Sequence, residues 1–91
     1  MKILVLNCGS SSIKYELFEM TDKSVLAEGQ VHRVGLPGSK IDHRKGTQSD
    51  KITISQIILD HMEGIQKVMN LLSSPEHGVL KSLDEINAVG H

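Results

Sequence analysis

The sequence has few aromatic residues, a single cysteine and no long apolar run. Tyr15 and Phe18 are the only large aromatic rings in 91 residues, so a core must be built from Ile, Leu, Val and Met. The single cysteine, Cys8, excludes an internal disulfide and is typical of a reducing compartment. Nothing nearby activates it, and we interpret Cys8 as a small buried residue rather than a nucleophile.

The chain also lacks any block of charge of one sign. Ten basic and eleven acidic residues give a net charge of -1, which excludes the basic stripe that nucleic acid or an anionic membrane requires. The first apolar run, Ile3-Leu4-Val5-Leu6, is too short for a signal peptide or a membrane span. We therefore expect a cytoplasmic protein without nucleic-acid or membrane partners.

The length and the hydrophobic content describe one small ordered domain. Of the 91 residues 38% are hydrophobic and 23% are charged, which is ordinary for a globular protein. A chain of this length buries a smaller share of its surface than a longer one, so its core is marginal.

Two strands joined by a short polar loop are predicted at the start of the chain. The run Ile3–Leu6 has no polar alternation, which predicts a strand covered on both faces. Ile13, Tyr15 and Leu17 alternate with polar residues, so a second strand follows with one polar face. The loop over Cys8–Ser12 is so short that the two strands must pair antiparallel.

Three further strands and a helix are predicted downstream. A strand is expected over Ser24–Val34, and a peripheral hairpin over Lys40–Arg44 and Lys51–Ser55. Asp60 can cap a helix, with Glu63 as its capping-box partner. The predicted apolar face of that helix, which ends at Ser73-Ser74-Pro75, holds Met62, Ile65, Val68, Met69 and Leu72.

The end of the chain is predicted to hold a helical turn and the start of another strand. Ser82–Ile86 favours a short turn, and Ala88–His91 begins an apolar segment. Because the chain stops within that segment, we expect it to be a piece of a longer polypeptide.

One constellation carries the residue types of a chemical site, namely Asn7-Cys8-Gly9-Ser10-Ser11-Ser12-Ile13-Lys14. It places hydroxyls, a carboxamide and backbone N–H groups in a tight turn after a buried strand. Gly9 permits backbone conformations that a residue with a Cβ resists. Such a turn can surround phosphate oxygens with donors, with the positive charge of Lys14 nearby.

The same residues have a purely structural interpretation, since a Gly-Ser-rich hairpin loop is most often only a turn. It is not a Walker loop, because no Gly-Lys-Ser/Thr ending leads into a helix. It lacks the glycine spacing of a dinucleotide fingerprint. Lys14 faces away from Tyr15, and a lone strand lysine is usually just solvated. The five histidines show no zinc-ligand spacing and are expected to be surface or structural residues: His32, His43, His61, His77 and His91.

The opening segment Met1–Met20 resembles the start of acetate kinases, which belong to the acetate and sugar kinase, heat-shock and actin superfamily. The carrying motif is Asn-x-Gly-Ser-Ser-Ser-x-Lys at Asn7–Lys14. Segments Ser24–Gly29, Gly78–Ser82 and Asp84–His91 resemble later family segments in the same order. The resemblance implies an α/β fold, namely an incomplete ribonuclease H-like (actin-like ATPase) lobe whose mixed sheet opens with a β-hairpin.

The resemblance also implies roles for individual residues. Gly9, Ser10, Ser12 and Lys14 correspond to phosphate- and nucleotide-binding positions, and Asn7 to the asparagine of the magnesium region. The implied reaction is direct in-line phosphoryl transfer between ATP and acetate, giving ADP and acetyl phosphate, with Mg²⁺ as the cofactor. Residues 1–91 would form the N-terminal part of the first lobe of a two-lobe, homodimeric kinase.

No catalytic residue is expected within the chain, because the family's substrate arginines, catalytic aspartate and histidine, and adenosine site would follow His91. The chain alone is therefore predicted to be inactive. A propionate or other short-chain carboxylate kinase is the nearest alternative. Two features favour acetate: Tyr15, where propionate kinases often have phenylalanine, and the segment Asp84–His91. A non-catalytic folded module is the alternative for the isolated chain.

Overall fold

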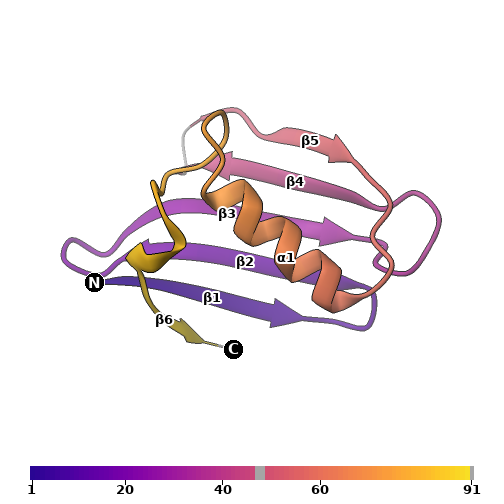
Figure 1. The fold of residues 1–91 in the computed structure, drawn as a ribbon, viewed down its shortest axis with the longest axis horizontal. Coiled ribbons are helices and arrows are strands. Elements are labelled where there is room, and N and C mark those ends of the chain that lie inside the picture. The colour runs from indigo at the N-terminus through magenta and orange to yellow at the C-terminus, as the bar shows by residue number, and fades with distance from the viewer. Residues whose placement is uncertain (47–48, 91) are drawn as a thin grey trace.

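A six-stranded mixed sheet with one helix across it forms the structure (Figure 1), a computed structural model that describes residues 1–46 and 49–90. The strand order is β5-β4-β3-β2-β1-β6. The strands are β1 (Lys2–Cys8), β2 (Ser12–Glu19), β3 (Ser24–His32), β4 (Lys40–Lys45), β5 (Ile52–Ser55) and β6 (Ile86–Gly90). The helical segments are α1 (His61–Leu72) and the 3-10 turn η1 (Leu83–Glu85).

The antiparallel part of the sheet confirms the predicted hairpins. β1 pairs antiparallel with β2, which pairs with β3, and β4 and β5 form the expected hairpin at the periphery. β3 ends at His32, two residues earlier than predicted, because Arg33 takes a left-handed conformation with φ 57°. The predicted last strand is β6, which lies parallel to β1. His91 lies outside the described residues.

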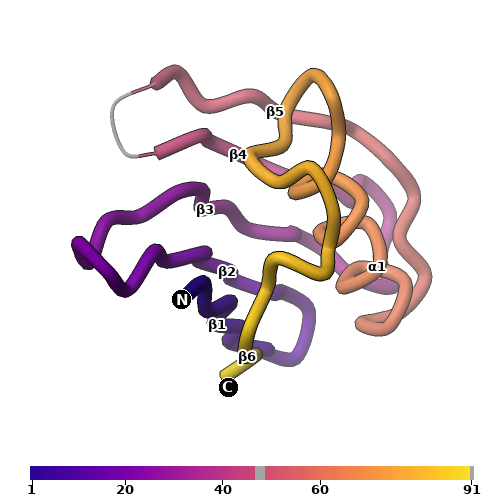
Figure 2. Tube along the Cα trace, turned by 60° about the vertical axis from the view of Figure 1, so that its left-hand side comes forward, coloured from indigo at the N-terminus to yellow at the C-terminus, as the bar shows by residue number. Residues whose placement is uncertain are grey.

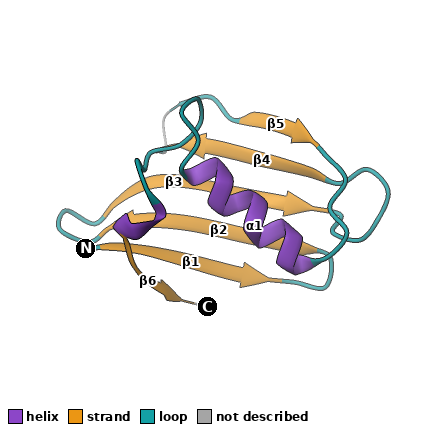
Figure 3. Ribbon diagram, in the orientation of Figure 1, coloured by secondary structure: helices purple, strands orange, loops and turns teal. Residues whose placement is uncertain are grey.

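The core lies on one face of the sheet, between the strands and α1. Figure 2 shows α1 on one side of the sheet, and Figure 3 shows the helix crossing the central strands. We call the opposite side of the sheet the outer face. The buried apolar side chains come from four strands, from α1 and from the connecting segments: Leu4, Leu6, Ile13, Tyr15, Leu17, Ala27, Val31, Val34, Ile41, Ile58, Val68, Leu71, Leu72 and Leu80.

The prediction that the first strand is covered on both faces was wrong. Leu4 and Leu6 are buried under α1, but Ile3 and Val5 point to the outer face and are only half-buried. They line a shallow apolar hollow with Phe18 and Met20. The aliphatic run therefore places apolar side chains on both faces of β1, but within the described residues only the face under α1 is buried.

The start of α1 confirms the predicted cap and corrects its details. The Asp60 carboxylate accepts the backbone N–H of Glu63 at 2.8 Å. The Glu63 carboxylate returns to the N–H of Leu59 at 3.4 Å, one residue before the position that a capping box uses. The predicted turn near Ser82 is η1, where Ser82 and Glu85 do form a capping box.

The buried face of α1 is rotated relative to the prediction. Met62 was placed on the apolar face, but its side chain is 80% exposed. The buried helical residues are Gly64, Val68, Leu71 and Leu72. A Cβ at Gly64 would lie 2.8 Å from Cδ1 of Ile13, so the helix lies against β2 through its glycine. None of the helices in the described part of the chain is long and apolar enough to cross a membrane.

Candidate functional site

The predicted phosphate loop is the turn Gly9–Ser11 between β1 and β2. Its backbone is closed by a hydrogen bond from the N–H of Gly9 to the carbonyl oxygen of Ser12, at 2.8 Å. Gly9 does not have a positive φ, so the expectation of an unusual backbone conformation there was wrong. A Cβ at Gly9 would lie 3.0 Å from Oγ of Ser12, a close contact that a small shift of this side chain would relieve.

Three of the predicted site residues share the outer face at this end of the hairpin. Asn7 pairs directly with Lys14 across the two strands, and directly opposed residues point to the same face. Ser12 lies two residues before Lys14 and therefore also faces outward. Ser10 lies at the tip of the turn. The structure thus brings Asn7, Ser12 and Lys14 to one surface.

Cys8 was predicted to be buried and is exposed. Cys8 lies two residues after Leu6, the last buried residue of β1, where the strand extends beyond the core. Its neighbour across the hairpin is Ile13, which is fully buried. Burial on this face therefore changes within one residue pair, a boundary that composition does not reveal.

Two residues that the sequence did not single out hold the backbone of the loop. The N–H of Val34 donates to the carbonyl oxygen of Ser11 at 2.9 Å. Nε2 of His61, the first residue of α1, donates to the carbonyl oxygen of Gly9 at 2.7 Å. His61 was expected to be a surface or structural histidine, and its contact with the loop had no signal in the local sequence.

The segment that carries Val34 is itself fixed by side chains. Nε of Arg33 donates to the carbonyl oxygen of Pro37 at 2.6 Å, and Oγ of Ser39 donates to that of Arg33 at 2.8 Å. These bonds support the left-handed conformation of Arg33, which a residue with a Cβ adopts only at a cost. They thereby hold the backbone next to Val34, whose N–H donates to the carbonyl oxygen of Ser11.

Most carbonyl oxygens of the loop already accept hydrogen bonds, whereas two of its N–H groups do not donate to the backbone. The carbonyl oxygens of Gly9, Ser11 and Ser12 each accept a hydrogen bond. Within the described part of the chain, the N–H groups of Ser10 and Ser11 have no backbone acceptor. A turn with two such N–H groups and three hydroxyls has the chemistry of an anion-binding concavity.

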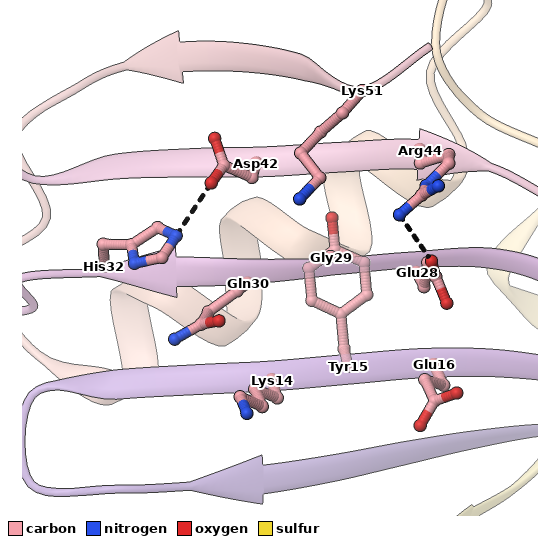
Figure 4. Close-up of a pocket in the computed structure, with 10 residues that line it drawn as sticks. All are labelled: Lys14, Tyr15, Glu16, Glu28, Gly29, Gln30, His32, Asp42, Arg44 and Lys51. Carbon is pink, nitrogen blue, oxygen red and sulfur yellow. Dashed lines mark hydrogen bonds and ion pairs between the residues drawn. The ribbon is translucent and has the colours of Figure 1, made fainter. Parts of the chain in front are cut away.

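Beyond the loop, the outer face of β2, β3 and β4 carries a polar pocket of about 240 Å³, with Lys14 among its lining residues (Figure 4). An ion pair and a hydrogen bond cross it: Arg44 lies 3.0 Å from Glu28, and Nε2 of His32 lies 2.9 Å from Oδ2 of Asp42. Oγ1 of Thr53 donates to Asp42 at 2.7 Å. This bond, followed by that to His32, lowers the pKa of Asp42 below its usual value.

On the opposite face, Tyr15 and His43 form a buried hydrogen-bonded pair. Nε2 of His43 donates to the carbonyl oxygen of His77 at 2.8 Å, because a carbonyl can only accept. Nδ1 therefore accepts from the hydroxyl of Tyr15, at 2.6 Å. Burial, with a smaller effect of the Asp42 carboxylate, raises the pKa of Tyr15, and burial lowers the pKa of His43.

The described residues do not form a metal site by themselves. They contain no group of three or more His, Cys, Asp or Glu side chains that could hold an ion. Asn7 offers one carboxamide oxygen, and its cross-strand neighbour Lys14 is a cation. Mg²⁺ commonly keeps several waters and binds through one or two protein oxygens plus substrate phosphates. Asn7 therefore fits a nucleotide-bound Mg²⁺ but not a protein-only site.

Comparison with known proteins identifies the family. The model of the acetokinase family matches residues 2–91. The chain belongs to the acetokinase family. An acetate kinase of Phocaeicola vulgatus is 56% identical over 91 residues, which are 100% of this chain and 23% of that protein. The chain thus spans about a quarter of the length of this acetokinase relative.

Solved acetokinase structures confirm the predicted fold class. The crystal structure of Porphyromonas gingivalis acetate kinase matches with a TM-score of 0.94 and 41% identity, over 99% of this chain and 22% of that chain. A propionate kinase from Francisella tularensis matches with a TM-score of 0.80 and 27% identity, over 99% and 21%. The mixed sheet is therefore part of an actin-like ATPase lobe.

Proposed function

We propose that this chain is the N-terminal part of the first lobe of an acetate kinase. The full-length enzyme would reversibly transfer the γ-phosphoryl group of ATP to acetate, giving acetyl phosphate and ADP. The observation that supports this most directly is the outer-face placement of Asn7, Ser12 and Lys14 beside a turn whose Ser10 and Ser11 N–H groups have no backbone acceptor within the described residues. Membership of the acetokinase family selects this reaction among phosphoryl transfers.

In this proposal the loop stabilises charge without forming a covalent intermediate. The hydroxyls of Ser10 and Ser12, with the backbone N–H groups beside Gly9, would donate to the equatorial oxygens of the transferred group. Lys14 would compensate negative charge on the nucleotide phosphates. Charge is spread over those oxygens in the transition state, so pre-positioned donors lower its energy relative to water.

Mg²⁺ enters the proposal as a cofactor carried by the nucleotide, where it would neutralise phosphate charge. The carboxamide of Asn7 would orient it, directly or through a water molecule. Within the described residues no acidic cluster competes for that role. The catalytic residues and the acetate pocket would lie in the remainder of the polypeptide, so the isolated chain should not turn over.

The test is the activity of the full-length protein and of two lysine variants. Acetyl phosphate formed from ATP, Mg²⁺ and acetate is trapped with hydroxylamine. Lys14→Ala should lower kcat/KM about 10- to 1000-fold, because a charge facing the phosphates is lost. Lys67→Ala, on α1, is the matched control and should stay near wild type. Absence of acetyl phosphate with the wild-type protein, or equal rates for both variants, would contradict the proposal.

A propionate or other short-chain carboxylate kinase is the second candidate, favoured by the Francisella propionate kinase match. One methylene changes selectivity by only about 1–3 kcal/mol, so both acids should be tested at saturating ATP. A higher kcat/KM for propionate would select this candidate. We also propose that the full-length enzyme is a cytoplasmic homodimer, which sedimentation and cell fractionation would test.

A further inference from the structure

The side chain of His61 connects the first turn of α1 to the predicted phosphate loop. Its Nε2 lies 2.7 Å from the carbonyl oxygen of Gly9, a residue 52 positions earlier. That oxygen can only accept, so the hydrogen is on Nε2. His61 is half-buried, whereas its neighbour Met62 points into solvent. The imidazole is therefore turned toward the loop, while the next residue is turned away from the sheet.

This hydrogen bond fixes the direction of the peptide between Gly9 and Ser10. In a planar trans peptide, the C=O of one residue and the N–H of the next point in opposite directions. Holding the Gly9 oxygen toward α1 directs the Ser10 N–H away from α1. This amide is one of the loop donors that have no backbone acceptor within the described residues.

A second bond fixes the following part of the loop by the same geometry. The N–H of Val34 holds the carbonyl oxygen of Ser11, which sets the peptide between Ser11 and Ser12. The two anchors come from different elements, one from the β3–β4 connection and one from α1. Of the two, only His61 acts through a side chain, so substitution can remove it without altering the anchoring backbone.

We infer that His61 is a positioning residue that sets the Ser10 amide and the Gly9–Ser12 turn for phosphoryl transfer; this inference rests on the proposed function. The histidine does not touch the reacting groups. It restricts the loop to one peptide orientation before the phosphate arrives. A misplaced donor costs far more in rate than the hydrogen bond contributes to stability.

The experiment compares two variants of His61 in the full-length protein. His61→Leu removes the donor, whereas His61→Gln keeps an amide nitrogen close to the place of Nε2. His77→Leu is the matched control, because the His77 side chain pairs with the exposed Glu76 and, within the described residues, makes no hydrogen bond to the loop. His61→Leu should lower kcat about 10- to 100-fold with little change in KM for ATP. His61→Gln should restore kcat to within about 3-fold of wild type.

A spectroscopic readout separates positioning from general destabilisation. With carbonyl-¹³C glycine and ¹⁵N serine, only Gly-Ser peptides give a correlated NMR signal, and residues 1–91 contain two, Gly9–Ser10 and Gly38–Ser39. His61→Leu should move the Gly9–Ser10 signal and leave the Gly38–Ser39 signal in place. The thermal midpoint of His61→Leu should lie within about 2 °C of that of His77→Leu. If the leucine variant does not fold, His61→Asn, whose amide is too short to reach, takes its place.

Three outcomes would overturn the inference: an unmoved Gly9–Ser10 signal, a kcat equal to that of His77→Leu, or a glutamine variant as slow as the leucine variant. If the wild-type protein makes no acetyl phosphate, the proposed function fails by itself. The NMR signal then still tests whether His61 sets the Gly9–Ser10 peptide, because it does not depend on turnover.

Discussion

Replacing Tyr15 by phenylalanine should destabilise the sheet, although the ring is retained. Tyr15 is 1% exposed, and its hydroxyl lies 2.6 Å from Nδ1 of His43, which is equally buried. The two rings are also stacked, with centroids 5.9 Å apart and planes 22° apart. Tyr15→Phe keeps this packing but leaves Nδ1 of His43 buried without its donor.

The expected cost follows from the unpaired acceptor. Leaving a buried polar atom unsatisfied costs about 1–3 kcal/mol, more than the hydrogen bond contributes net. A flip of the His43 ring would not give Nδ1 a new partner without loss, because Nε2 would then give up its hydrogen bond to the carbonyl oxygen of His77, at 2.8 Å. We therefore expect a loss of about 1–2 kcal/mol, which corresponds to a factor of about 5–30 in an unfolding equilibrium.

Native-state hydrogen exchange of the full-length protein measures this loss locally, since a global unfolding transition would mix it with other lobes. Protection of the amides in β2, β3 and β4 should fall by that factor in Tyr15→Phe. A double-mutant cycle with His43→Leu isolates the pair. In the His43→Leu background, Tyr15→Phe should cost less, or even stabilise, because it removes a hydroxyl that has lost its acceptor.

Unchanged protection in Tyr15→Phe would refute this reasoning, because it would mean that the hydroxyl contributes nothing to the buried pair. An equal cost with and without His43 would refute it differently, by assigning the effect to the packing of the tyrosine ring. Only a coupling of about 0.5 kcal/mol or more between the two sites supports the hydrogen bond as the cause.

Two further predictions concern the surroundings of this pair. Gly29→Ala should destabilise the protein by about 3 kcal/mol or more, because the new Cβ would lie 2.3 Å from both the Tyr15 hydroxyl and the Asp42 carbonyl oxygen; a wild-type thermal midpoint would contradict it. Burial lowers the pKa of His43 below 6.5 in the folded state, so the unfolded state binds more protons below that pH. The contribution of His43 to stability should therefore be constant above pH 6.5 and fall as the pH drops from there to its folded-state pKa, by at most about 1.4 kcal/mol per pH unit, and His43→Leu should flatten this part of the dependence in thermal scans.

Local patterns were sufficient to predict the hairpin, the alternating faces of β2 and the cap at Asp60. Each depends on residues that are close in sequence. The short turn forces the two strands to pair antiparallel, and the Asp60 carboxylate accepts a hydrogen bond from an N–H group in the first turn of the helix that it caps. The register that places Asn7 opposite Lys14 was not predicted and comes from the structure of this hairpin. Their ligand stays a prediction, because no part of the fold tests it.

The errors have one physical origin, which is that burial is decided by distant parts of the chain. The apolar residues of α1 indicated a face that included Met62, but Gly64 faces the sheet and carries no hydrophobic signal. Cys8 was interpreted as a small buried residue and is exposed in the structure. Likewise, the contact of His61 with Gly9 depends on how α1 crosses the sheet, which no local pattern specifies.

The geometry of the loop is consequently a property of helix packing as much as of the Gly-Ser sequence. Gly64 lies one turn after His61 and brings α1 so close to β2 that a Cβ would meet Ile13 at 2.8 Å. Ile13 directly follows Ser12, so the helix contacts the sheet at the base of the loop. A larger residue at position 64 would lift this end of α1 and draw the imidazole away from the Gly9 oxygen. Gly64 and His61 therefore act together. Gly64 sets the distance between α1 and the sheet, and at that distance the His61 imidazole reaches the Gly9 oxygen and orients the loop.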